Sequence, residues 1–174
     1  GQISGKPKIQ IAREVVRDLM KDWDETLNLG LSAYGHRRKG DCQDIQTLIP
    51  LGKADPKKVV SIVNALQPKG MTPLSEAVKR AAQELKYEKE QAIVILVSDG
   101  EENCKANPCE LGKALEAAGV DFTTHVVGFD VAKSKQAGLR CLAKNTGGSF
   151  FAAKDAGELH KALTGVLQQT KKVS

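Results

Sequence analysis

The sequence predicts an α/β domain: a doubly wound, mostly parallel sheet with helices on both faces and one antiparallel hairpin at its edge. The segment Ala92–Ser98 is an apolar run rich in β-branched residues and without alternation, which is typical of a strand buried on both faces of a parallel sheet. Helical patterns alternate with strand patterns along the chain, as in proteins built from βαβ units. The acidic turn Asp99-Gly100-Glu101 follows the buried run, and the carboxyl edge of such a sheet is where ligands bind.

Composition and charge are those of an ordinary soluble domain. The 174 residues suffice for a single domain with a sizeable core, and 41% of them are apolar and 27% charged. The longest uncharged apolar run, Ala92–Ser98, is far too short to cross a membrane. The net charge of +5 is dispersed, apart from the run His36-Arg37-Arg38-Lys39. Because aromatic residues make up only 4% of the chain, we interpret this run as a solvated loop and expect no nucleic-acid partner.

The first part of the chain predicts a helix, a hairpin and a second helix. Residues 8–22 have the spacing of an amphipathic helix, with these residues on one face: Ile9, Ala12, Val16, Leu19, Met20 and Trp23. Residues 27–34 and 45–51 read as strands, the second of them an edge strand because of Pro50. The loop between them is too short for a helical crossover, so they should pair antiparallel. Pro56 begins a helix that ends near residue 66.

The second part alternates helices with short strands. Thr72 is the expected N-cap of a helix that has Pro73 at its first position and extends to about residue 85. Gly119 and the turn Asn145-Thr146-Gly147-Gly148 are typical helix stops. The expected strands are residues 92–98, 120–129 and 149–152, and the expected helices are residues 110–118, 135–144 and 156–169.

Four cysteines favour at least one disulfide and an extracytoplasmic home, periplasmic or secreted. Cys104 and Cys109 are the expected pair, because the four residues between them include Pro108 and can fold back. Cys42, at the tip of the hairpin, is the competing partner. Cys141 has leucines close by in the sequence and is expected to be a buried thiol. Four reduced cysteines remain the alternative. No Cys-x-x-Cys pair accompanies them, which excludes the usual zinc sites.

Thr72 and Asp99 form the candidate metal site. Thr72 begins one helix and Asp99 ends the strand that follows, so a right-handed crossover brings both to the same edge of the sheet. Hydroxyl and carboxylate oxygens are hard ligands that suit Mg²⁺, Mn²⁺ or Ca²⁺. The phosphate-binding and nucleophile-elbow motifs of nucleotide-binding proteins and hydrolases are not found in the sequence.

Taken in order, these segments resemble the von Willebrand factor A-type domain family, which has a Rossmann-like fold. The likeness covers nearly the whole chain and looks closest to bacterial stand-alone members. It rests on the hairpin at residues 27–51 and on Gly70-Met71-Thr72-Pro73-Leu74, Val97-Ser98-Asp99-Gly100, Gly128-Phe129-Asp130 and the run from Asn145 to Phe151. The resemblance implies a metal-ion-dependent adhesion site at the sheet edge, with Thr72 as the ligand from the second loop and Asp99 as the ligand from the third.

One part of the family pattern is missing from the sequence. The first metal loop, Asp-x-Ser-x-Ser, should end a strand just before the first helix, whereas this chain begins Gly1-Gln2-Ile3-Ser4-Gly5. We therefore expect residues 1–174 to be a single domain truncated at its N-terminus. Its sheet should close by direct pairing of residues 27–34 with Ala92–Ser98, or by a swapped strand from a second copy in a homodimer, unless the first strand is present outside the sequence given. Two oxygen ligands should bind a divalent ion only weakly, so Mg²⁺ could be absent.

Two classes of function follow. The first, which we favour, is a non-enzymatic adhesion or scaffold module whose metal site captures an acidic side chain of a protein partner. The alternative is a metal-dependent hydrolase that uses Asp99 as nucleophile or ligand. A hydrolase also needs a general acid or base, and His36 is the only histidine expected at that edge, since His125 lies within a strand and His160 within a helix.

Overall fold

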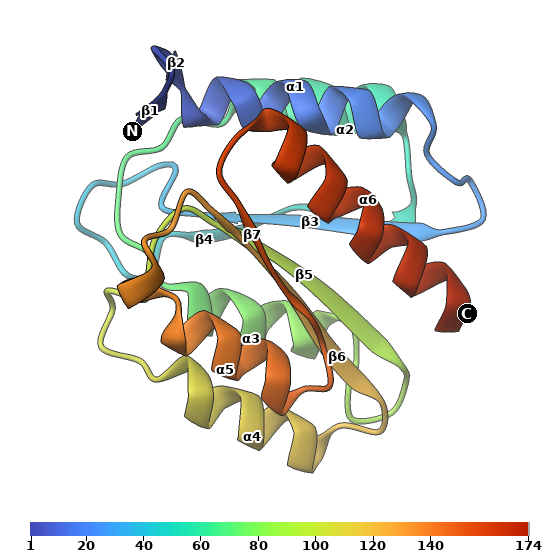
Figure 1. Cartoon of the computed structure of the whole chain (residues 1–174). Coiled ribbons are helices and arrows are strands. Elements are labelled where there is room, and N and C mark those ends of the chain that lie inside the picture. The colour runs from blue at the N-terminus through green and yellow to red at the C-terminus, as the bar shows by residue number, and fades with distance from the viewer. Residues whose placement is uncertain (174) are drawn as a thin grey trace. The chain divides into compact units, whose positions relative to one another are not determined.

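A computed structural model describes residues 1–173. The chain forms two compact units, the first over Gly1–Met71 and the second beginning at Thr72. Figure 1 labels the helices and strands of both units. The predicted elements are present in the predicted order, and most boundaries differ by only a few residues from the expected ones.

The first unit packs two helices on an antiparallel hairpin. Strands β3 and β4 pair antiparallel as predicted, from Asn28 opposite Lys53 to Tyr34 opposite Ile45. Met20 of α1 and Val59 and Val63 of α2 form the buried cluster that apolar residues of the hairpin contact. The elements are β1 (Gln2–Ile3), β2 (Lys6–Pro7), α1 (Lys8–Lys21), β3 (Asn28–Tyr34), β4 (Ile45–Lys53) and α2 (Pro56–Ala65).

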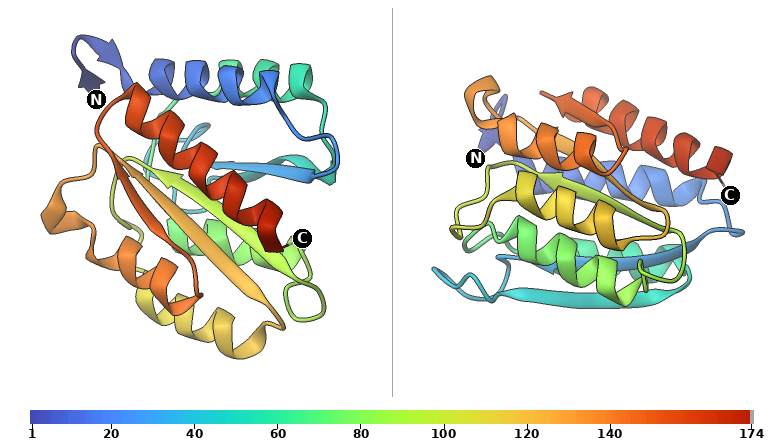
Figure 2. Two further views of the ribbon diagram at one scale, coloured as in Figure 1. Left: turned by 45° about the vertical axis from the view of Figure 1, so that its right-hand side comes forward. Right: turned by 90° about the horizontal axis from the view of Figure 1, so that it is seen from below.

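The second unit is a three-stranded parallel sheet in the order β5-β6-β7. Helices α3, α4 and α5 cover one face of this sheet and α6 covers the other (Figures 1 and 2). Its elements are α3 (Leu74–Glu84), β5 (Ala92–Ser98), α4 (Pro108–Ala118), β6 (Phe122–Phe129), the 3-10 turn η1 (Lys133–Lys135), α5 (Ala137–Asn145), β7 (Phe150–Ala153) and α6 (Ala156–Val173). The α/β fold class predicted from the sequence is therefore the observed one.

The strand buried along most of its length is β6 and not β5. Strand β6 lies between its two neighbours, and only Thr123 among its residues is not fully buried. Strand β5 ends the order of its sheet, and Val97 on it is 39% exposed. The continuous apolar run correctly predicted a parallel strand but not its place, because apolar composition does not distinguish a middle strand from a terminal one.

The hairpin and the parallel sheet are separate hydrogen-bonded sheets. How the sheet closes around the missing first strand stays a prediction. Register within each sheet is regular apart from shifts in β3–β4 between Leu29 and Ser32.

The turn before β7 shows why its glycines are needed. The Thr146 hydroxyl is buried and accepts a hydrogen bond from the Thr124 amide of β6 at 2.9 Å. Gly147 has φ of +68°, which non-glycine residues rarely adopt. A Cβ atom on Gly148 would overlap with the carbonyl oxygen of Thr124. The turn thus lets α5 return close against the sheet before β7 begins.

Candidate functional site

The carboxyl ends of the parallel strands meet at one edge of the second unit. Ser98 of β5 is in register with Gly128 of β6, and Phe129 with Ala153 of β7. Asp99 and Asp130, the residues that follow β5 and β6, are consequently placed at the same edge, and both are exposed. This is the edge at which parallel α/β sheets bind their ligands.

Glu102 ties the loop after β5 to the start of α3. One carboxylate oxygen of Glu102 accepts a hydrogen bond from the Ser75 amide at 2.8 Å, and the other accepts one from the Cys104 amide at 2.9 Å. Ser75 is buried in the first turn of α3. A carboxylate at a helix N-terminus satisfies an otherwise unpaired amide and interacts favourably with the helix dipole.

This arrangement corrects the expected cap of α3. The helix begins at Leu74, with Pro73 at the N-cap position and no capping hydrogen bond from that residue's side chain. Thr72 lies one residue before the cap, so it is not the N-cap that its place before Pro73 suggested. The capping interaction comes instead from Glu102, which accepts from the Ser75 amide and lies 27 residues after Ser75 in the chain.

Asn103 makes a second link between the same two segments. Its side-chain oxygen accepts a hydrogen bond from the Thr72 amide at 2.6 Å, and its own amide lies 3.4 Å from the Thr72 carbonyl oxygen. The backbone of Thr72 is therefore held against the loop. The Thr72 hydroxyl oxygen lies 3.9 Å from the position that a Cβ atom on Gly100 would occupy.

The structure thus brings the two predicted site residues into one neighbourhood. Thr72 is half-buried and its hydroxyl lies beside Gly100, while Asp99, the residue before Gly100, is exposed. Sequence reasoning missed Glu102 and Asn103, which fix this neighbourhood. No motif marks them; the only available signal was the cluster of acidic and amide side chains directly after a buried strand.

A small cavity of about 300 Å³ lies between this loop and the start of α5. Polar side chains at its lining include Glu101, Asn107 and Lys135, and Leu139 contributes apolar surface. Glu101 and Lys135 form an exposed ion pair at 3.1 Å. Such exposed pairs contribute little to stability. The cavity therefore provides a depression along the loop that follows β5, with one ion pair in its lining.

The donors at this edge suit a hard divalent cation in kind but not in number. Thr72 and Asp99 carry oxygen atoms of the kind that such an ion takes as ligands, and Glu102 accepts two backbone amides and Asn103 one. Within residues 1–173 no group of three or more histidine, cysteine or acidic residues is arranged to hold a metal. A full shell for Mg²⁺ or Ca²⁺ needs about six oxygens, so the described residues supply only part of one.

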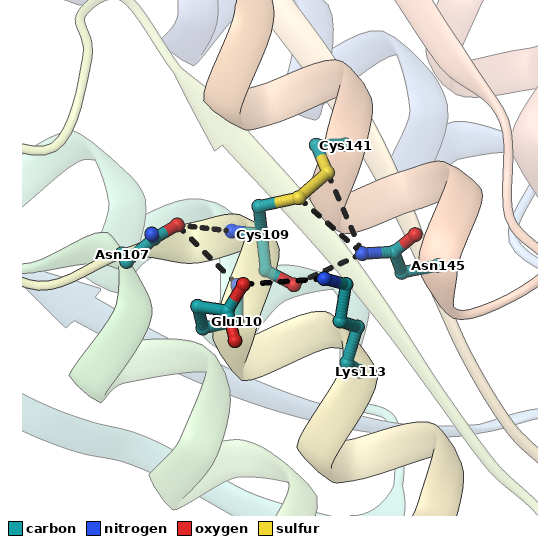
Figure 3. Close-up of polar contacts among 6 residues, drawn as sticks. All are labelled: Asn107, Cys109, Glu110, Lys113, Cys141 and Asn145. Atoms are coloured by element: carbon teal, nitrogen blue, oxygen red, sulfur yellow. Dashed lines mark hydrogen bonds and ion pairs between the residues drawn. A yellow bond between two sulfur atoms is a disulfide. The ribbon is translucent and has the colours of Figure 1, made fainter.

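The disulfide of the second unit joins α4 to α5 (Figure 3). Cys109 is bonded to Cys141, with their Cα atoms 5.0 Å apart. The expected pairing of Cys104 with Cys109 is therefore wrong, and Cys141 is not the buried thiol that its neighbours suggested. None of the four cysteines is a free thiol.

Close helix packing explains the observed pair. Gly112 lies on α4 one turn after Cys109, and a Cβ atom there would lie 3.0 Å from Cβ of Asn145 on α5. The two helices therefore approach closely at this point. The Asn145 side-chain amide donates to the Cys109 carbonyl oxygen at 2.9 Å and lies 3.4 Å from the sulfur of Cys141 (Figure 3). Asn107 caps α4 through the amides of Cys109 and Glu110.

The two histidines of the second unit are placed away from Asp99. His125 is buried within β6 opposite Ile95, and its Nδ1 accepts a hydrogen bond from the Ser149 amide at 3.1 Å. Burial lowers the pKa of His125 below its usual value. His160 is exposed on α6, which covers the sheet face opposite α3.

None of the helices among residues 1–173 is both long and apolar enough to cross a membrane.

Comparison with known proteins agrees with the fold. The YwmC protein of Bacillus subtilis is 25% identical over 172 residues, which is 94% of this chain and 75% of that protein. An aerotolerance-related membrane protein from Bacteroides fragilis has a similar structure, with a TM-score of 0.68 at 15% identity over 93% of this chain and 89% of its own. Proximal thread matrix protein 1 from the mussel byssus, with a zinc-occupied MIDAS motif, superposes with a TM-score of 0.64 at 18% identity over 92% of this chain and 40% of its own. The sequence profile of the von Willebrand factor type A domain matches residues 1–102, more than half of the chain. The chain belongs to the von Willebrand factor type A domain family.

Proposed function

We propose that the second unit is a non-enzymatic binding module that captures an acidic side chain of a protein partner at the carboxyl edge of its sheet. The observation that carries the proposal is the link between the β5–α4 loop and the start of α3. Glu102 and Asn103 hold these segments together through backbone amides. The exposed Asp99 and the Thr72 hydroxyl are thereby offered on a preorganised surface, and preorganisation reduces the entropy lost on binding.

A divalent ion could bridge this edge of the sheet and the partner's carboxylate. Mg²⁺, Mn²⁺ or Ca²⁺ would be held by Thr72 and Asp99, and a bound ion would supply positive charge toward the partner's carboxylate. The zinc-occupied MIDAS motif of the mussel protein supports this assignment by similarity. Because the described residues provide only two donors, we expect weak affinity for the ion alone and tighter binding when a carboxylate is present.

Binding is favoured over hydrolysis by the placement of the groups that could move a proton. A hydrolase built on Asp99 would need a general acid or base within hydrogen-bond reach of the reacting atoms. His125 lies within a central strand and has a lowered pKa, and His160 lies on the opposite face of the sheet from α3. Glu102 is engaged by two amides. The second unit therefore places neither of its histidines beside Asp99, which supports a surface that binds rather than one that reacts.

An extracytoplasmic location fits the same proposal. None of the four cysteines is a free thiol, and disulfides persist in oxidising compartments such as the periplasm or outside the cell. The structurally similar Bacteroides fragilis protein is described as a membrane protein. These observations support the proposal that the domain works outside the cytoplasm.

Immobilised nonapeptides with randomised flanks and a central Asp, Asn, Glu or Gln test the binding proposal. In Mn²⁺ we expect the wild-type chain to prefer central Asp or Glu over the isosteric amides by about tenfold, a difference of about 1.4 kcal/mol. EDTA, Asp99→Ala and Thr72→Ala should abolish this preference. Glu110→Ala, which changes an exposed carboxylate on α4, should leave it unchanged. Equal binding of acidic and amide peptides, or a preference that survives Asp99→Ala, would contradict the proposal.

A further inference from the structure

The hairpin loop of the first unit is a structured basic surface and not merely a solvated turn. Asp44 is fully buried at the base of this loop. Its carboxylate accepts hydrogen bonds from the amides of Arg37 and Arg38, at 2.7 and 2.8 Å, and from the Arg37 guanidinium at 2.7 Å. These hydrogen bonds hold the pKa of Asp44 well below its usual range, against the opposing effect of burial. The loop is thus fixed around a buried carboxylate whose ion-pair partner, Arg37, is partly exposed.

The same loop is clamped to the segment that precedes α3. The carbonyl oxygen of Gly35 accepts hydrogen bonds from the amides of Lys69 and Gly70, at 2.9 and 3.0 Å. A Cβ atom on Gly70 would lie 2.6 Å from the Arg38 carbonyl oxygen, which only glycine avoids. Gly35 likewise faces the Met71 carbonyl oxygen so closely that a side chain would overlap with it. The backbone conformation of both segments is therefore set by this close approach.

Four cations converge on this structure, and we name Arg37, Arg38, Lys39 and Lys69 the basic patch. All four residues are exposed. The neighbouring negative charges are Asp44, which is buried against Arg37, and Asp41, which pairs with Arg38 at 2.9 Å. Lys39 and Lys69 form no ion pair within the first unit. The patch therefore carries excess positive charge on a rigid backbone.

The electrostatic environment of His36 agrees with this description. Burial has the largest effect and lowers the pKa of His36; the charges of Arg37 and Lys69 lower it further, while Asp44 raises it. Lys69 thus acts on the loop although it lies 33 positions from His36 in the sequence. Arg37 and Lys69 are therefore both close enough to His36 to affect its pKa.

We propose that the basic patch is an interaction surface for a negatively charged segment of a protein partner. The inference rests on the proposed function. A partner that presents an acidic side chain to Asp99 and Thr72 is a negatively charged protein, and the basic patch attracts negative charge. Charge complementarity carries it: rigid, exposed cations whose neighbouring carboxylates are already paired raise the rate and specificity of association with an acidic surface. An acidic peptide is favoured over a nucleic acid because aromatic side chains that could stack on bases make up only 4% of the chain.

Nuclear magnetic resonance titration with deca-glutamate tests this surface without any metal. We expect the largest amide shifts within residues 36–40 and at Lys69. The double variant K39E/K69E should weaken the apparent affinity at least about tenfold, and raising the salt concentration should weaken it as well. The matched control K57E/K58E changes two exposed lysines at the start of α2 and should bind like wild type. The substitutions change side chains only and leave the Lys69 amide able to donate to the Gly35 carbonyl oxygen, so both variants should remain folded.

The outcomes separate this inference from the proposed function. Shifts spread over lysines of several helices, or equal weakening by K39E/K69E and K57E/K58E, would overturn the basic patch as a distinct surface. Tighter binding of a single-stranded oligonucleotide of equal charge at the same residues would overturn its assignment to a protein partner. Asp99→Ala should leave the deca-glutamate shifts unchanged. The titration therefore tests the basic patch independently of the proposed binding site at Asp99.

Discussion

Replacing Glu102 by alanine should destabilise the domain far more than replacing its neighbour Glu101. The Glu102→Ala variant leaves two backbone amides without their acceptor, those of Ser75 and Cys104. Ser75 is only 4% exposed, so water cannot readily replace the lost partner at the start of α3. A net hydrogen bond to a charged group contributes roughly 1.5–3 kcal/mol, and loss of a helix cap costs roughly 0.5–2 kcal/mol.

These contributions overlap, because the Ser75 amide is counted in both. We therefore expect Glu102→Ala to lower the free energy of unfolding by about 2–4 kcal/mol. Glu101 forms only an exposed ion pair with Lys135, so Glu101→Ala should cost at most about 1 kcal/mol. Glu102→Gln keeps an acceptor oxygen but loses the charge. The free energy of unfolding that it loses should therefore lie between the losses in Glu101→Ala and Glu102→Ala.

Urea unfolding followed by circular dichroism measures all three variants against wild type. For a chain of this size, the Glu102→Ala change corresponds to a fall in Tm of roughly 4–16 °C. If Glu102→Ala and Glu101→Ala unfold within about 0.5 kcal/mol of each other, Glu102 does not hold the loop to α3 and the reasoning is refuted.

Three further predictions use other parts of the chain. Replacing both Cys109 and Cys141 by serine opens a loop of 32 residues. Because the unfolded chain then gains conformational entropy, the free energy of unfolding in urea should fall by about 3–4 kcal/mol. An unchanged free energy of unfolding would mean that the disulfide does not constrain the chain. Because burial lowers the pKa of His125, the unfolded state binds a proton on this side chain at a higher pH than the folded state does, so the stability due to neutral His125 is fully present above pH 6.5 and falls as the pH drops below it. H125N keeps an acceptor for the Ser149 amide and should lessen this acid sensitivity. Equal pH profiles of stability for the two proteins would contradict the assignment. Gly148→Ala should cost at least about 2 kcal/mol in the same urea assay, because its Cβ atom would overlap with the Thr124 carbonyl oxygen. Gly165→Ala in α6, where the space is open, should instead stabilise the fold by about 0.5–1 kcal/mol.

Local patterns in the sequence predicted most of the fold. The bounds of β5 are those expected, since an apolar run between a charged segment and an acidic turn has few alternatives. The antiparallel pairing of β3 with β4 followed from the short loop between them. Helix starts at Pro56 and stops at Gly119 followed from proline and glycine chemistry.

Features that depend on contacts between distant segments could not be predicted in this way. The Cys109–Cys141 pair depends on how closely α4 approaches α5 at Gly112, which spacing along the chain does not encode. The cap of α3 by Glu102 replaced the local cap expected from Thr72, because a tertiary contact supplied a charged acceptor. The relation between Thr72 and Asp99 was accessible to the sequence through topology, but the residues that fix it were not.

Paramagnetic broadening by Mn²⁺ tests the central claim that the binding edge of this domain is formed by the start of α3 and the loop after β5. Substoichiometric Mn²⁺ should selectively broaden the amide signals of Thr72 and of residues 99–103 in the wild-type chain. Asp99→Ala should remove this broadening, whereas Glu116→Ala, a change on the exposed surface of α4, should leave it intact. Broadening centred on another acidic region, or unchanged in Asp99→Ala, would contradict the account.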